Sequence, residues 1–245
     1  MADMRKLGII GGVSWHSSIE YYRLLNQGVS QRLGSTHSAK LVLSSLDFSE
    51  LLEWQKAEDS NALKQAFLAE GERLKSAGCE GLIVASHTLS WLGDYIQNEI
   101  GLEHVSLYDA LFMRLRNLSA QSVGLVGTRY TMGDQRYREE YEKAGFIIKT
   151  PDEPHFTKIA RAIYKELVHG EFKDETRVLF EHCFDHLAEK GADTIVLGCT
   201  EIGLLVKDRE WRARTLAHRN SIALVDLIET HVAASVDWML KCEPC

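Results

Sequence analysis

The chain carries GADTIVLGCTE at residues 191–201, and a related segment, GCEGLIVASHT, occurs earlier at residues 78–88. Both segments begin with glycine, continue through apolar residues and end in residues with polar or thiol side chains. A short apolar run without polar alternation is typical of a strand that is buried on both faces, as in a parallel sheet. The repeat therefore predicts two equivalent buried strands, each followed directly by polar side chains.

A second pair of segments repeats in the same order. LGIIGG at residues 7–12 matches VGLVGT at residues 123–128. One α/β unit is therefore expected twice, and the fold class is α/β with two pseudo-symmetric, doubly wound halves. Each half is expected to contain a parallel sheet of four-stranded type. Because ligands of such folds bind at the carboxyl ends of the strands, we expect the active site in the cleft between the halves.

The segments between the repeats have strand and helix patterns in alternation. Of the two halves, the first is expected to contain residues 1–117 plus 221–245 and the second residues 118–220. The strand 222–225 and a helix from Asp226 are expected to return to the first half and complete it. Prolines mark an irregular loop at residues 151–154, which we expect beside the site of the second half. The expected strands are 7–10, 39–43 and 82–85, and the expected helices are 17–33 and 61–77.

Composition limits the classes of partner. The 245 residues carry a net charge of −7, which disfavours a nucleic-acid or anionic-membrane partner because either one requires a basic surface. The N-terminus leads directly into a strand pattern without a signal peptide, and the apolar runs are too short to span a bilayer, so a cytoplasmic protein is expected. The five cysteines are odd in number and scattered, which predicts reduced thiols. The CxxC spacing of Cys242 and Cys245 is interpreted as incidental.

The repeat aligns Ser86 with Cys199. Each is expected where a buried strand ends and a helix begins, and backbone N–H groups at a helix start lower the pKa of a thiol. A thiolate at Cys199 can take a proton from carbon or attack an electrophile, so Cys199 is the candidate catalytic residue. Cys79 and Cys183 are interpreted as ordinary buried apolar residues.

Glycine-rich loops follow the first strand of each half. Residues 11–14 and 127–129 allow a ligand to approach the backbone amides, although tight turns explain these glycines equally well. The sequence lacks the GxGxxG and GxxxxGK[ST] patterns, so no nucleotide is expected.

Taken together, the ordered motifs resemble the aspartate/glutamate racemase superfamily over essentially the whole chain. They are GIIGGVSW at 8–15, GTRYTM at 127–132, the segment 158–167 and LGCTEI at 197–202. The resemblance is closest to the branch of broad-specificity and L-aspartate/glutamate-directed racemases. It implies a small amino-acid substrate and an enzyme without pyridoxal phosphate or a metal. In that family two cysteines lie on opposite sides of the substrate Cα, where one removes the α-proton and the other returns a proton. A homodimer is expected, although the sequence itself does not determine the oligomeric state.

The resemblance also assigns individual roles. Lys158 is expected to pair with one substrate carboxylate, and Thr88 and Thr200 to cradle the other. Glu201 and His231 are either supporting groups of the site or, respectively, a solvated carboxylate and a packed histidine. The expected catalytic residues are Cys199, Ser86 and His87, and the expected substrate-binding residues are Gly12, Val13, Ser14, Gln55, Thr88, Thr128, Lys158, Thr200 and Glu201.

This sequence departs from the family pattern at the first thiol. Ser86-His87-Thr88 stands where the family has Cys-Asn-Thr, and Leu46-Asp47-Phe48 replaces a cationic position. A serine hydroxyl is much less acidic than a thiol, so His87 is either the missing acid/base or an ordinary histidine. Three functions stay open: an amino-acid racemase, a one-thiol decarboxylase or other carbanion-forming enzyme, and a ligand-binding pseudoenzyme. Exchange of the α-proton with solvent deuterium distinguishes the enzymes from a binding protein.

Overall fold

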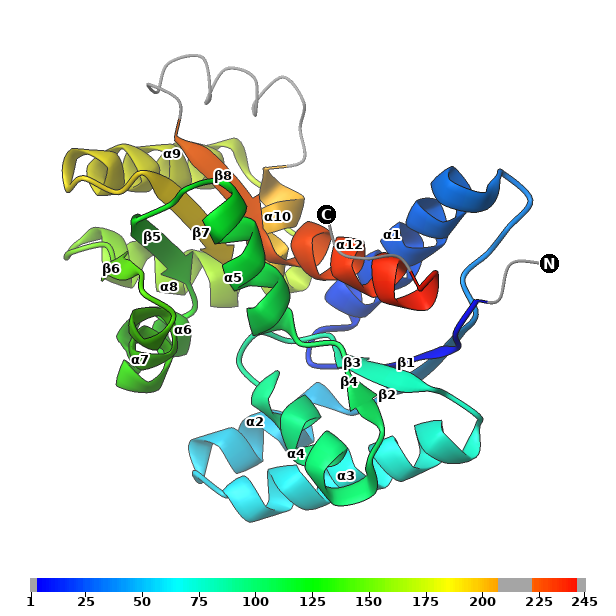
Figure 1. Cartoon of the computed structure of the whole chain (residues 1–245). Coiled ribbons are helices and arrows are strands. Elements are labelled where there is room, and N and C mark those ends of the chain that lie inside the picture. The colour runs from blue at the N-terminus through cyan, green and yellow to red at the C-terminus, as the bar shows by residue number, and fades with distance from the viewer. Residues whose placement is uncertain (1–3, 207–221, 242–245) are drawn as a thin grey trace. The chain divides into compact units, whose positions relative to one another are not determined.

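The computed structural model describes residues 4–206 and 222–241. This part of the chain forms two compact units, which divide between Ala110 and Leu111 and again between Leu227 and Ile228. Each unit contains one parallel four-stranded sheet with helices around it (Figure 1). The prediction of an α/β fold with two doubly wound halves is confirmed.

The first sheet has the strand order β2-β1-β3-β4. In register, Leu7 of β1 lies beside Leu41 of β2 and Gly81 of β3. The strands are β1 (Leu7–Gly11), β2 (Leu41–Ser45), β3 (Gly81–Val84) and β4 (Glu103–His104). The helices of this unit are α1 (Trp15–Leu33), α2 (Phe48–Lys56), α3 (Ser60–Ser76), α4 (Trp91–Ile100) and α12 (Leu227–Met239), which begins at the unit boundary.

The second sheet has the equivalent order β6-β5-β7-β8, as the repeat in the sequence predicts. In register, Gly127 of β5 lies beside Gly198 of β7. The strands are β5 (Ser122–Gly127), β6 (Ile147–Lys149), β7 (Thr194–Gly198) and β8 (Ala223–Asp226). The helices are α5 (Leu107–Asn117), which spans the unit boundary, α6 (Arg129–Gly133), α7 (Gln135–Lys143), α8 (His155–Lys165), the short 3-10 helix η1 (Leu167–His169), α9 (Asp174–Glu189) and α10 (Thr200–Leu205).

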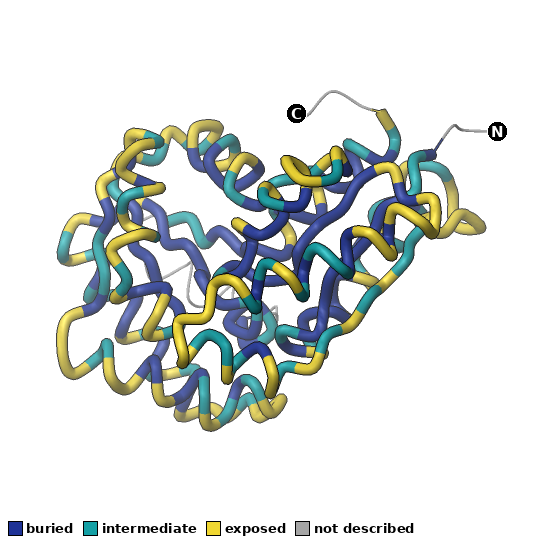
Figure 2. The backbone as a smooth tube through the Cα atoms, turned by 90° about the horizontal axis from the view of Figure 1, so that it is seen from below, coloured by how far each residue is buried: buried dark blue, intermediate teal, exposed yellow. Residues whose placement is uncertain are grey.

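Helices cover both faces of the first sheet, so its central strands are buried on both sides. The side chains of Leu7 and Ile9 pack with α1 and α12, whereas that of Ile10 packs with α2, α3 and α4. Gly8 permits the close approach of α3, since a Cβ at this position would lie 2.8 Å from a methyl carbon of Leu74. Figure 2 shows the result along the chain, with long buried stretches at the strands and alternating burial along the helices.

The last strand of each sheet is followed by a helix that packs in the other unit. After β4, α5 enters the second unit, where Phe112 packs edge-on against Tyr141 of α7 at a centroid distance of 5.2 Å. After β8, α12 packs in the first unit through Ile228, Val232 and Val236. The expectation that the strand near residues 222–225 completes the first half is therefore wrong, because β8 pairs in parallel with β7. Only the helix that follows β8 joins the first unit.

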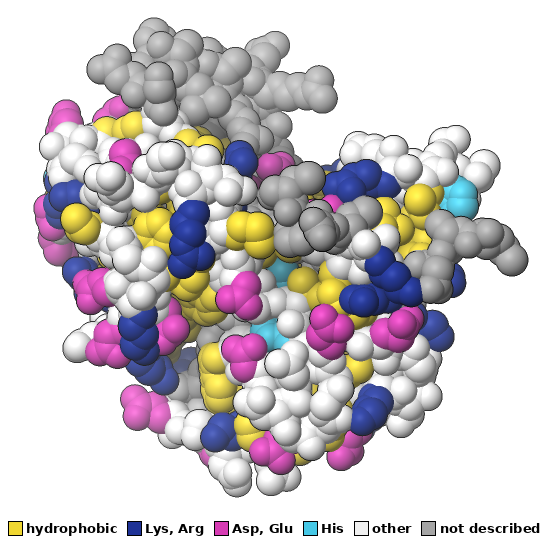
Figure 3. Space-filling model, viewed as in Figure 1, with side chains coloured by type: hydrophobic (Ala, Val, Ile, Leu, Met, Phe, Trp, Pro, Cys, Tyr) yellow, Lys and Arg dark blue, Asp and Glu magenta, His cyan; other side chains and the backbone are white. Residues whose placement is uncertain are grey.

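No helix among the described residues is long and apolar enough to cross a membrane. Acidic and basic side chains are interspersed over the face of the molecule shown in Figure 3. Cys79 and Cys183 are free and buried, as predicted. Cys242 and Cys245 lie outside the described residues.

Candidate active site

Cys199 stands at the carboxyl end of the central strand β7, in the second unit. Its backbone is extended and forms the N-cap of α10, as the repeat predicts. The residue is only 7% exposed. Its thiol donates a hydrogen bond to Glu201 Oε2 at 3.0 Å, and the Thr200 hydroxyl donates to the same oxygen at 2.8 Å. The structure therefore brings together three of the predicted site residues.

The electrostatic environment holds Cys199 as a thiol. Burial raises the pKa of Cys199 well above its ordinary value, and the negative charge and hydrogen bond of Glu201 raise it further. The backbone N–H groups of Glu201 and Ile202 lower this pKa but do not outweigh the burial. The prediction that the helix start makes Cys199 partly thiolate in the resting protein is therefore wrong. The suggestion that Glu201 is a solvated carboxylate is also wrong, because this side chain is buried.

Thr128 adjoins Cys199 because β5 and β7 end in register. Its hydroxyl caps α6 by accepting the N–H of Thr131 at 3.1 Å, and the Thr131 hydroxyl lies 3.5 Å from the carbonyl oxygen of Gly198. Tyr164 of α8 hydrogen-bonds to Thr128 and lies near enough to Cys199 for the two groups to influence each other electrostatically. Burial and the nearby Tyr130 and Cys199 raise the pKa of Tyr164. Sequence reasoning missed Tyr164, because no motif marks a tyrosine on a separate helix.

Ser86, the counterpart of Cys199, lies at the carboxyl end of β3 in the first unit. Its hydroxyl lies 3.2 Å from that of Thr88, and it accepts the N–H of Leu89 at 3.4 Å. A turn at residues 88–90 separates Ser86 from α4, which begins at Trp91. The prediction that a helix begins directly at this position is wrong, since the N–H of Leu89 bonds to the Ser86 side chain and the Ser90 hydroxyl bonds to the carbonyl of His87.

His87 is a buried residue of the same turn, not a solvent-facing one. Its ring lies 5.4 Å from the ring of Tyr108, with an angle of 49° between the two planes. A role as acid or base stays a prediction. So does the expectation that Ser86 and Cys199 face each other, because these residues belong to different units.

The loop after β1 is a tight turn held by hydrogen bonds. Gly12 has φ of +88°, and a Cβ there would overlap the backbone of Leu46, so local structure explains this glycine without a ligand. The Ser18 hydroxyl accepts the N–H of Gly12 at 3.0 Å and donates to the carbonyl of Ser14 at 3.2 Å. The hydroxyl oxygen of Ser14 is buried without a hydrogen-bond partner. An unsatisfied buried hydroxyl is costly, and a bound ligand would relieve that cost.

The remaining predicted residues occupy varied environments. Val13 packs partly against the core formed by α2, α3 and α4, and Gln55 is a partly buried residue in the last turn of α2. Lys158 is exposed on α8, and after burial and the charge of His186 its own charge also lowers the pKa of His155. The substrate roles of these residues stay predictions.

His231 of α12 is a packed histidine of the first unit. Its Nε2 lies 2.7 Å from the Val105 carbonyl oxygen, which can only accept, so Nε2 carries the proton. Its Nδ1 then accepts the Tyr21 hydroxyl at 2.9 Å. Burial lowers the pKa of His231 to about 4. The neutral imidazole is therefore a structural group.

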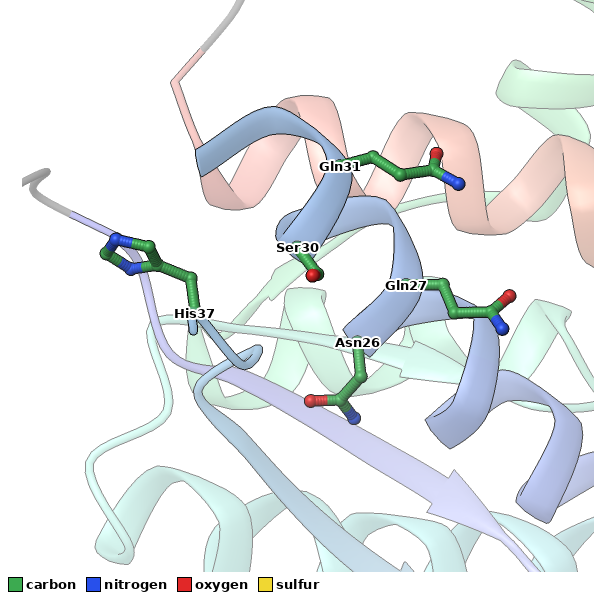
Figure 4. Close-up of a pocket in the computed structure, with 5 residues that line it drawn as sticks. All are labelled: Asn26, Gln27, Ser30, Gln31 and His37. Atoms are coloured by element: carbon green, nitrogen blue, oxygen red, sulfur yellow. The ribbon is translucent and has the colours of Figure 1, made fainter. Parts of the chain in front are cut away.

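A polar pocket on the surface of the first unit lies away from the carboxyl ends of the strands. It is lined by side chains of the second half of α1 and the following loop (Figure 4). Because α1 runs back from the carboxyl end of β1, this part of the helix lies toward the amino ends of the strands. In the described ranges no group of three or more His, Cys, Asp or Glu side chains is placed to hold a metal ion. The residues that line the pocket are Asn26, Gln27, Ser30, Gln31 and His37.

The chain is thus an α/β protein of two units with equivalent parallel sheets, and in the second unit a buried thiol lies beside a carboxylate directly after the central strand. The sequence profile of the Asp/Glu/hydantoin racemase family matches residues 10–235. The chain therefore belongs to this family.

Solved structures agree with this assignment. A candidate Asp/Glu racemase from Yersinia pestis is 35% identical, with a TM-score of 0.85 over 97% of this chain and 100% of the other. An aspartate racemase homologue from Pyrococcus horikoshii is 24% identical, with a TM-score of 0.78 over 97% and 100%. Arylmalonate decarboxylase is 15% identical, with a TM-score of 0.57 over 96% and 92%. The last two likenesses concern the fold alone.

Proposed function

We propose that this protein is a cofactor-independent amino-acid racemase that acts on a small acidic or polar amino acid. The observation that carries the proposal is the buried Cys199 thiol, which directly follows β7 and donates a hydrogen bond to Glu201. The family supports the reaction class, since its name describes Asp/Glu racemases. Cys199 exchanges a proton with the substrate Cα, and Ser86 or His87 serves the opposite face.

The protonated state of Cys199 in the resting protein decides which proton transfer this residue is ready to make. A protonated thiol is ready to donate to a carbanion, whereas its conjugate base must form before it can remove an α-proton. Glu201, at 3.0 Å from Sγ, can accept that proton when the substrate enters. The Ser86 hydroxyl is a much weaker acid than a thiol. Inversion is therefore slower than α-proton exchange, and the two enantiomers exchange at different rates.

Substrate recognition in this proposal uses residues of both units. Ser14 offers a hydroxyl that is buried without a partner, and Thr88, Thr128 and Thr200 offer hydroxyls next to the strand ends. Gly12, Val13 and Gln55 complete the binding site on the first unit. Lys158 pairs with a carboxylate of the substrate on the second.

The test follows both deuterium at Cα and chirality for a panel of L- and D-amino acids in deuterium oxide. Cys199→Ser abolishes exchange, while the matched change Cys79→Ser, in a buried thiol of the first unit, leaves it intact. Ser86→Cys raises inversion in both directions. Exchange retained in Cys199→Ser, or inversion as fast as exchange in the wild type, contradicts this proposal.

One observation favours a second candidate, a one-thiol decarboxylase. Cys199 is held as a thiol, whereas the aligned residue of the first unit, Ser86, carries only a hydroxyl. A single protonated thiol can protonate a carbanion from one face, and this is the chemistry that a decarboxylase needs. Such an enzyme releases carbon dioxide from a geminal dicarboxylic acid in deuterium oxide and places one deuterium on the product carbon. It leaves the α-protons of amino acids unexchanged, so the same panel separates the two functions.

A further inference from the structure

Arg129 is a cation beside the candidate active site to which the proposed reaction assigns no role. It directly follows Thr128, at the carboxyl end of β5. The adjacent strand β7 ends in register with β5 and leads directly into Cys199. Arg129, Thr128 and Cys199 all belong to the second unit, so this unit alone fixes their arrangement.

An aromatic ring holds the side chain of Arg129. The guanidinium carbon lies 5.6 Å from the centroid of the Phe156 ring on α8, which is a cation–π distance. The end of α6 also approaches this ring, since a Cβ at Gly133 would lie 3.3 Å from one of its carbons. A guanidinium over an aromatic face keeps its N–H groups at the edge of its own plane, where they can bind a carboxylate as a fork.

The same side of α8 also carries a group that lies near the thiol. Tyr164 follows Phe156 by eight residues, about two helical turns. Its phenol hydrogen-bonds to Thr128, and it lies near enough to Cys199 for that residue to raise its pKa. Burial is the main cause that raises the pKa of Tyr164, and the charge of Arg129 opposes that increase. The guanidinium and the thiol therefore both lie near this phenol.

The charge of Arg129 is not paired within the part of the chain that the structure describes. No ion pair there includes Arg129. In contrast, the nearby Arg136 pairs with Asp134 at 2.5 Å. An ordered guanidinium without a carboxylate partner, beside a candidate catalytic thiol, suits an anionic group of a ligand.

The proposed reaction brings such a group to this strand end. The substrate Cα must lie about 3–3.5 Å from Sγ of Cys199 for a proton to pass between them. The α-carboxylate is bonded to that carbon and therefore lies close to the same thiol. As the α-proton leaves, the electron pair of the C–H bond stays on Cα and spreads onto the α-carboxylate. A fixed cation at this position stabilises the carbanion, because preorganised charge acts where negative charge develops.

We propose that Arg129 binds the α-carboxylate of the substrate and stabilises the carbanion that forms beside it. This inference rests on the proposed function, because it assigns a further catalytic residue to the same site. In that function Lys158 distinguishes acidic from neutral substrates and so pairs with the side-chain carboxylate. The two cations therefore have different tasks, and substitution of each one has its own signature.

The test uses three ligands that differ only in which carboxylate is present as an amide. L-Aspartate has both carboxylates, L-asparagine keeps only the α-carboxylate, and L-isoasparagine keeps only the side-chain carboxylate. Dissociation constants are measured by calorimetry on the full chain. Arg129→Gln weakens the binding of aspartate and asparagine by about 10- to 150-fold, as expected for the loss of a charge-assisted hydrogen bond, and leaves that of isoasparagine unchanged.

The rate of α-proton exchange gives a second readout. Arg129→Gln also lowers kcat for aspartate, because the carbanion loses more stabilisation than the bound substrate does. Lys158→Ala has the complementary effect, with weaker binding of aspartate and isoasparagine but unchanged binding of asparagine. The matched control is Arg161→Gln, at a cation of α8 that lies five residues after Phe156 and thus on a different side of the helix, and it changes none of these values.

Three results overturn the inference: Arg129→Gln weakens all three ligands equally, it weakens none of them, or the wild type binds none of them. Exchange that persists in the wild type then leaves the proposed function intact. Conversely, a wild type that binds the ligands as expected but exchanges no α-proton refutes the proposed function and leaves Arg129 as the residue that binds the α-carboxylate. Thermal unfolding shows whether Arg129→Gln is folded. Arg129→Lys retains a charge but lacks the fork, and it weakens aspartate and asparagine without affecting isoasparagine.

Discussion

Replacing Glu201 with glutamine tests the electrostatic account of Cys199. The substitution keeps the shape of the side chain but removes the negative charge that lies 3.0 Å from Sγ. Of the three causes that raise the pKa of Cys199, two belong to Glu201 and the third is burial. A hydrogen bond to a charged group contributes about 1.5–3 kcal/mol, which corresponds to about a 10- to 150-fold larger thiolate fraction at a given pH.

The assay is the rate of alkylation of Cys199 against pH, followed by mass spectrometry of the peptide that contains it. The profile of Glu201→Gln moves to lower pH, and the rate at a fixed pH below the pKa rises by that factor. Glu189→Gln, at an exposed carboxylate of α9, provides the matched control and leaves the profile unchanged. If the profile of Glu201→Gln is unchanged or moves to higher pH, the view that this carboxylate holds the thiol protonated is refuted.

Three further predictions concern recognition and stability. Lys158→Ala raises the KM of an acidic substrate by about 10- to 150-fold and that of a neutral substrate much less, whereas the control Lys165→Ala changes neither KM. If Lys158→Ala raises the KM of both substrates equally, Lys158 is a surface charge. The pKa of His231 is lowered from 6.5 to about 4. The neutral, buried imidazole therefore stabilises the fold fully above pH 6.5, and the free energy of unfolding falls by about 3 kcal/mol as pH falls toward 4. Denaturant unfolding against pH shows this slope in the wild type but a smaller one in His231→Asn. Burial raises the pKa of Cys183 from 9.0 to about 12. The contribution of its buried thiol to the free energy of unfolding is therefore present below pH 9.0 and is lost as pH rises toward 12, by about 1.4 kcal/mol per pH unit. In Cys183→Ala the free energy of unfolding declines less steeply over this range.

The α/β class and the positions of the strand ends were predictable from the sequence because they depend on local pattern. The apolar runs that end before Ser86 and Cys199 form the central strands β3 and β7, as predicted. The match between residues 7–12 and 123–128 also predicts the equal strand orders of the two sheets. In these segments burial, propensity and turn residues favour the same structure.

The partner of the last strand was not predictable in the same way. Residues 222–226 are apolar enough for either sheet, and the choice depends on which sheet edge offers free N–H and C=O groups. Parallel pairing with β7 satisfies them, while the helix after β8 packs with α1. Strand pairing and helix packing are separate tertiary choices, so two adjacent elements belong to different units.

By itself, the sequence determined that a cysteine ends the central strand of the second repeat and a serine that of the first. Tertiary structure alone decided the protonation state of that cysteine. A helix start lowers the pKa of a thiol over a short range, but burial and the Glu201 carboxylate at 3.0 Å raise it by more. Residue order cannot give this balance, because it depends on how closely the surrounding chain excludes water and on where one neighbouring side chain turns.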